Sequence, residues 1–133
     1  RLLAGAAAGQ LRVVVVHQPV AVTRAEDASN RLRGHAAALR RWAAAGADLV
    51  MGGHIHLPYV QALHGLARPM WAVQAGTAVS SRVRAGVPNS VNLLRWQGAV
   101  APQGGCLIEQ WDYARGARAF VRTVVSTVHP ARA

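Results

Sequence analysis

Two short apolar runs, residues 11–16 and 48–51, enclose a stretch with helical periodicity. Within residues 30–45, apolar side chains recur at spacings of three and four, namely Leu32, Ala36, Leu39, Trp42 and Ala43. A strand, a helix and a second strand in this order place two parallel strands in one sheet. The chain is therefore expected to be an α/β protein. The continuous β-branched run at 11–16 is typical of a fully buried strand.

Local signals set the expected ends of this unit. Pro19 stops the first strand, and residues 20–28 are expected to form a loop. Asp27 or Ser29 is expected to cap the helix, because short polar side chains satisfy the free amides of a first turn. Gly46 is expected to end it.

The second half of the chain has a different pattern. Short strands are expected at 59–63, 70–74, 90–95, 105–111 and 119–125, with glycine- or proline-containing turns between them. These strands are expected to form a largely antiparallel sheet. Residues 127–133 are expected to be a loose tail.

Composition narrows the classes of protein. The chain has 133 residues, enough for one domain, and a formal net charge of +10 with no lysine. The arginines are scattered along the sequence, which makes an Arg-rich nucleic-acid-binding domain the weaker alternative. The single cysteine, Cys106, excludes an internal disulfide, favours a cytoplasmic location, and is expected to be a small buried hydrophobe. No apolar run reaches the length of a membrane span.

Histidines follow both apolar runs of the strand–helix–strand unit. His17 ends the first run, and Gly52-Gly53-His54-Ile55-His56 follows the second. Residues two apart in an extended segment point the same way, and glycines let the backbone approach an ion. The carboxyl ends of neighbouring parallel strands are where ligand sites collect. His17, His54 and His56 are therefore predicted to be metal ligands.

Carboxylates are scarce. The chain contains only Glu26, Asp27, Asp48, Glu109 and Asp112. A self-sufficient hydrolytic metal site usually has carboxylates near its histidines. The sequence therefore predicts that this chain holds only part of a metal site.

The histidine segments resemble those of a known family. Residues 48–56 are similar to the closing Gly-His-x-His motif of calcineurin-like metallophosphoesterases, and residues 13–19 are similar to the strand ending in His-x-Pro that precedes it. Residues 74–82 and 88–92 resemble the segment after the histidines in bacterial, cyclic-nucleotide-phosphodiesterase-like members. The resemblance covers about residues 11–96. The paired histidine motifs are specific, and the later segment is supportive only.

This resemblance implies metal-dependent hydrolysis of a small-molecule phosphoester at a site with two divalent ions (Mn, Fe or Zn). His17 and His54 would bind one ion and His56 the other. The family's earlier Asp- and His-containing motifs, which include the general-acid histidine, are absent. Residues 1–133 are therefore expected to be the C-terminal half of one four-layer α/β/β/α sandwich domain, with little hydrolytic activity alone.

Other site residues and functions remain open. Arg82 and Arg84 are candidates for binding substrate phosphate, and Gly76 and Thr77 for bordering the site. A non-catalytic remnant, or a module that needs a partner chain, would also fit a half sheet with exposed apolar surface. The metallo-β-lactamase pattern is disfavoured, because its His-x-His continues to Asp-His whereas Leu57-Pro58 follows here.

Overall fold

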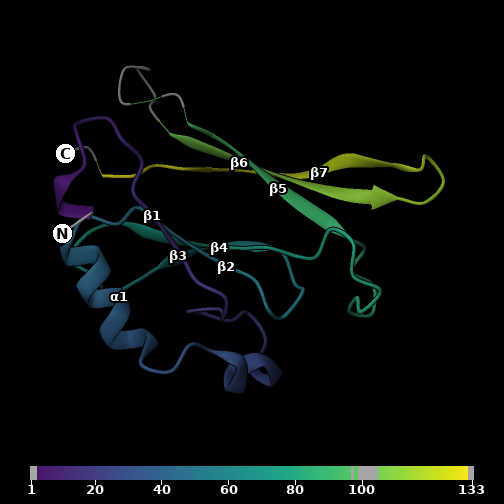
Figure 1. Ribbon diagram of the computed structural model, residues 1–133, viewed down its shortest axis with the longest axis horizontal. Helices are drawn as coiled ribbons and strands as arrows, with labels where there is room; N and C mark the ends of the chain where they lie inside the picture. Colours follow the sequence, from purple (N-terminus) through teal and green to yellow (C-terminus); the bar gives the residue numbers. More distant parts are fainter. Residues whose placement is uncertain (1–2, 97, 99–104, 132–133) are drawn as a thin grey trace.

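The computed structural model describes residues 3–96, 98 and 105–131, which form a mixed α/β fold of two sheets and few helices (Figure 1). The four-stranded sheet has the order β1-β2-β4-β3, and the three-stranded sheet has the order β5-β6-β7. The strands are β1 (Val13–Val15), β2 (Leu49–Gly52), β3 (Tyr59–Leu63), β4 (Met70–Gln74), β5 (Ser90–Trp96), β6 (Cys106–Ala114) and β7 (Ala119–Val128). The helices are α1 (His35–Ala44) and the 3-10 turns η1 (Leu3–Gly5) and η2 (Ala25–Asn30).

The predicted strand–helix–strand unit is confirmed, since β1 pairs parallel to β2 with α1 between them in the chain. The expectation that β3 and β4 belong to the antiparallel sheet is wrong. β4 pairs parallel to β2 on its other side, and β3 pairs antiparallel to β4. The physical reason is burial: most of β4 is inaccessible to solvent, as a central strand covered on both faces requires.

The expectation of a fully buried first strand is also wrong. β1 is an edge strand of three residues, and the Val15 side chain is 75% exposed. The β-branched run explains why this segment is extended, but it cannot reveal which strands or layers cover it. One edge of the parallel sheet, ending at His17, is therefore open within the described residues.

The helix begins later than expected. Gly34, with a φ of 75°, precedes α1 without a side-chain cap, and Asp27 lies in η2 within the expected loop. Asp27 does not cap α1, because it lies inside η2, and its carboxylate binds Arg84 instead. Gly46, with a φ of 96°, follows the helix as expected for a left-handed stop.

The four-stranded sheet lies between α1 and the three-stranded sheet (Figure 1). Alternate residues of β2 face opposite layers: Val50 belongs to the cluster that contains Leu39 of the helix, and Leu49 to the cluster that contains Ile108 of β6. Cys106 is fully buried in the second cluster, and burial raises the pKa of its thiol. It is an inert packing residue, as expected.

The predicted loose tail is wrong for the residues described. β7 continues to Val128, which is 3% exposed, and Arg68 donates to the Ala131 carbonyl at 3.0 Å. Residues 132–133 lie outside the described residues. In the part of the chain that the structure describes, no helix is long and apolar enough to cross a membrane.

Candidate metal centre

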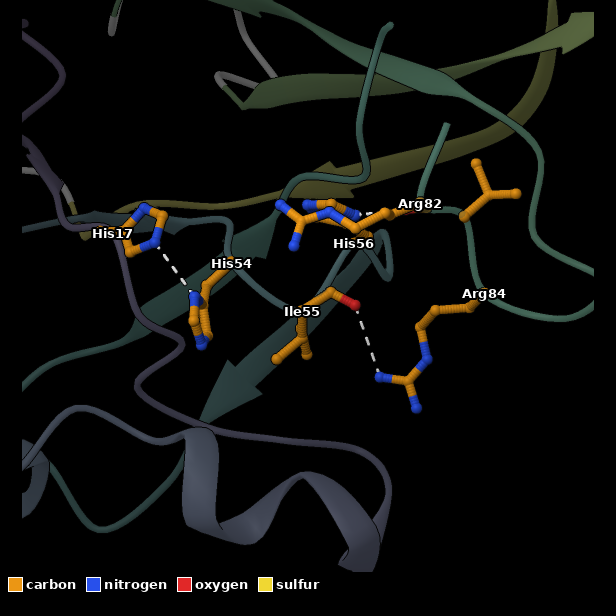
Figure 2. A pocket seen from close by; sticks show the side chains of 7 residues that line it. His17, His54, Ile55, His56, Arg82 and Arg84 are labelled. Atoms are coloured by element: carbon orange, nitrogen blue, oxygen red, sulfur yellow. Dashed lines mark hydrogen bonds between the residues drawn. The ribbon is translucent and has the colours of Figure 1, made fainter. Parts of the chain in front are cut away.

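His17 and His54 meet at the carboxyl ends of β1 and β2 (Figure 2). His17 Nε2 and His54 Nδ1 lie 3.0 Å apart, and the two rings meet edge to face with centroids 4.9 Å apart. The backbone holds the segments together, because the Gly53 amide donates to the His17 carbonyl at 2.9 Å. Both histidines are exposed.

His56 lies in the same cavity, which has a volume of about 400 Å³ and is also lined by Arg82 and Arg84. Its Nδ1 donates to the Arg82 carbonyl at 2.5 Å. A carbonyl only accepts, so this bond places the ring hydrogen on Nδ1. Nε2 of the neutral ring is therefore left with a free lone pair.

The backbone of the His-x-His segment is not extended, so the expectation from strand geometry is wrong. His54 has a φ of 68° and His56 a φ of 53°, both in the left-handed region. Ile55 and Leu57 are buried and anchor the segment between these turns. Left-handed conformations at non-glycine residues cost about 1–3 kcal/mol each and concentrate at functional sites.

Gln74 supports this segment from the end of β4, and sequence reasoning missed it. Its side chain is 2% exposed, and its Nε2 donates to the Gly53 carbonyl. A buried amide needs such partners, because an unpaired one costs free energy. The sequence signal that could have identified it is a polar residue at the end of an otherwise apolar strand.

The two glycines before His54 differ in their surroundings. A Cβ at Gly52 would lie 2.7 Å from Gln74 Oε1, whereas a Cβ at Gly53 would have its nearest neighbour at 3.9 Å, the His17 carbonyl oxygen. The expectation that both glycines make room for an ion is therefore wrong for Gly52. That glycine is required by packing against Gln74.

The two candidate arginines have different surroundings. The Arg84 guanidinium binds Asp27 at 2.7 and 2.9 Å and Glu26 at 2.8 Å, so both of its terminal nitrogens already donate to carboxylates. Arg82 is exposed, and its guanidinium makes no ion pair with any carboxylate of the described residues. In Figure 2 the Arg82 side chain extends from beside His56 toward His54. Arg82 is the arginine that remains available to an anion.

The nitrogen donors fit part of a metal site. Two nitrogens bound to one ion at about 2.0–2.1 Å lie about 2.9–3.4 Å apart, depending on coordination geometry. The separation of 3.0 Å between His17 and His54 falls in that range. Among residues 3–96, 98 and 105–131, however, no group of three or more His, Cys, Asp or Glu side chains could hold an ion.

The carboxylates of the chain are all engaged away from the histidine cavity. All five already have partners in the described structure: Glu26 and Asp27 with Arg84, Asp48 with Arg68, Glu109 with Arg122, and Asp112 with Thr123. None lines the cavity of the three histidines. Any carboxylate ligands of a complete site must therefore come from elsewhere.

Two other histidines and two expected border residues lie away from this cavity. His64 is exposed in the turn after β3, and His35 begins α1 with its ring bonded to the Leu32 carbonyl. Gly76 and Thr77 are not among the cavity residues, contrary to expectation. The reason is the path of the chain: a Cβ at Gly76 would lie 2.2 Å from the Ser90 side chain, so this segment faces the second sheet.

The chain was compared with protein-family models and with curated protein sequences. Neither a protein-family model nor a curated protein sequence matches this chain.

Proposed function

We propose that this chain supplies the histidine ligands of a two-metal centre that hydrolyses phosphoesters, as in the calcineurin-like metallophosphoesterases its motifs resemble. The observation that carries the proposal is the meeting of His17 and His54, with nitrogens 3.0 Å apart at the ends of adjacent parallel strands. Neutral imidazole binds Zn, Mn and Fe. His17 and His54 would hold one ion, and His56 would hold the other through its free Nε2.

Two bound ions would activate a water and neutralise charge on the phosphoryl oxygens. The chain's own residues orient the substrate. Arg82 can donate two parallel N–H bonds to phosphate oxygens, and the absence of a carboxylate partner leaves those donors free. The Arg82 carbonyl at the same time fixes the ring of His56. The proposed substrate class is a small phosphoester.

The proposed domain is one half of a four-layer α/β/β/α sandwich, whose other half would carry the carboxylate ligands. Exposed apolar residues support this version, in which the chain needs a further segment or a partner chain to complete its site. Val15 is 75% exposed on the open edge strand, and Val124 and Val125 of β7 are 48% and 50% exposed. Single exposed apolar residues are ordinary, but a set of them on strand edges and sheet faces favours an uncompleted interface.

Metal titration tests the proposal. Isothermal titration of the chain with Zn²⁺ at neutral pH is expected to show binding that His17→Ala and His54→Ala each weaken at least ~10-fold, as ligand-sphere changes commonly do. His64→Ala removes a histidine outside the cavity and is the matched control. Equal losses in all three variants would contradict the proposal.

Hydrolysis and nucleic-acid binding separate the alternatives. The isolated chain is expected to show little turnover of bis(4-nitrophenyl) phosphate, since the carboxylate ligands are missing; strong metal-dependent turnover would refute the half-site. Binding to nucleic acid that disappears with added salt and is unchanged by His54→Ala would instead support the Arg-rich alternative.

A further inference from the structure

The segment after β4 carries Arg82 but has little regular structure to hold it. Residues 75–89 form no helix or strand. Val79 is 94% exposed and Val83 is 41% exposed, so apolar burial contributes little to its position. Yet the Arg82 carbonyl must stay in place to accept the hydrogen bond from His56.

Arg84 connects this segment to two others. Its Nη1 donates to both carboxylate oxygens of Asp27, and its Nη2 donates to Glu26, both in η2. The same Nη1 lies 3.5 Å from the carbonyl of Ile55, between the two histidines of the His-x-His segment (Figure 2). The guanidinium of Arg84, two residues after Arg82 in the chain, thus contacts both η2 and the turn that carries His54 and His56.

The partner of Arg84 is unusually well buried. The Asp27 side chain is 5% exposed and that of Arg84 is 22% exposed, whereas Glu26 is 66% exposed. A paired charge away from solvent is screened little by water, and its geometry is specific because the guanidinium is a rigid fork. The Asp27–Arg84 contact is therefore the strong part of this connection.

We propose that Arg84 is a positioning residue: its ion pair with Asp27 fixes the segment so that the Arg82 carbonyl holds the ring of His56. The bond keeps the hydrogen of His56 on Nδ1 and leaves Nε2 free. Hydrogen bonds of this kind fix the tautomer and orientation of metal-binding histidines. The value of this arrangement for metal binding rests on the proposed function, but the arrangement itself is measurable without a metal.

The test is a nitrogen-15 NMR measurement of the histidine tautomers in the metal-free chain above the histidine pKa. His56 is expected to be the Nδ1–H tautomer. In the double variant Asp27→Ala/Arg84→Ala, which leaves no buried carboxylate unpaired, the His56 signals are expected to move to tautomer-averaged positions. The His17 and His54 signals should move much less, because Gly53 and Gln74 hold that part of the site.

Two further variants exclude a general loss of structure. Arg84→Lys keeps a positive charge beside Asp27 but cannot bridge Asp27 and Glu26 as a fork does, so a partial shift of His56 is expected. Arg24→Ala removes a guanidinium that approaches Glu26 at 3.7 Å and pairs with neither Asp27 nor Ile55 in the described structure, and it keeps the backbone bond from the Asp27 amide to the Arg24 carbonyl. This matched control is expected to leave the His56 tautomer unchanged.

The outcomes separate the two proposals. If His56 keeps the Nδ1–H form in a folded double variant, or lacks it in the unsubstituted chain, the positioning role of Arg84 is refuted whatever the metal affinity. If His56 shifts and Zn²⁺ affinity falls about 10–100-fold, both proposals are supported. If His56 shifts but the unsubstituted chain binds no Zn²⁺, the geometric role of Arg84 stands and the proposed function fails.

Discussion

The two glycines before His54 give a sharp test of the packing at this site. In Gly52→Ala, the new Cβ would lie 2.7 Å from Gln74 Oε1 and 3.3 Å from the Gln18 carbonyl oxygen. The Gln74 amide must then turn away, because the backbone oxygen beside it cannot. Gln74 would lose its bond to the Gly53 carbonyl while remaining buried.

The size of the effect follows from these contacts. A buried amide left without its hydrogen-bond partner costs about 1–3 kcal/mol of unfolding free energy. In Gly53→Ala, the nearest atom to the new Cβ is 3.9 Å away, so no contact is strained. That variant is expected to be neutral or stabilised by about 0.4–1 kcal/mol, because alanine reduces the freedom of the unfolded chain.

Urea unfolding followed by tryptophan fluorescence measures both variants, and the midpoints can be compared where the slope is unchanged. Gly52→Ala is expected to unfold at clearly lower urea than Gly53→Ala. A second measurement places Gly52→Ala in a Gln74→Ala background, where the obstacle is gone and most of the penalty should disappear. Equal midpoints for the two glycine variants, or an undiminished penalty without Gln74, would refute the reasoning.

Two further predictions concern ionisable side chains that folding removes from solvent. Burial, followed by the charge of Asp27, raises the pKa of Tyr59 to about 12, above the ordinary value of about 10. Between these pH values the unfolded chain has released a proton that the folded chain retains, so stability should fall as the pH rises; Tyr59→Phe should lack this part of the decline in denaturant midpoint. Asp48→Ala leaves Arg68 without its buried carboxylate and should cost about 3–5 kcal/mol, measured by urea unfolding. Asp112→Ala, at a partly buried carboxylate that forms no ion pair with the described residues, is the matched control, and equal costs would contradict this assignment.

Much of the secondary structure follows from local pattern. The strands expected at 59–63 and 70–74 match β3 and β4 at both ends, and the later strands differ from β5, β6 and β7 by a few residues at their ends. Alternation, β-branched residues and turn-forming glycines influence only nearby residues in the chain. They therefore predict strands and turns without knowledge of the tertiary fold. The helix was expected too early, because periodicity does not show that a separate 3-10 turn and the left-handed Gly34 precede it.

The site was partly predictable for the same reason. Two histidines that end successive parallel strands must approach each other, and His17 and His54 do so at 3.0 Å. The left-handed turns at His54 and His56 were not predictable from alternation, since they accompany the burial of Ile55 and Leu57 in the folded chain. The support from Gln74 also depends on β4 lying beside β2.

Chain order and local periodicity were enough to specify the α/β class, the positions of most strands and the meeting of His17 with His54. The exposed edge position of β1 and the place of β4 in the parallel sheet emerged only from the folded arrangement. The folded arrangement also distinguished Arg82, whose guanidinium pairs with no carboxylate of the described residues, from Arg84, which binds Asp27. These outcomes depend on contacts between residues far apart in the chain. Local sequence patterns do not specify which distant residues will be in contact.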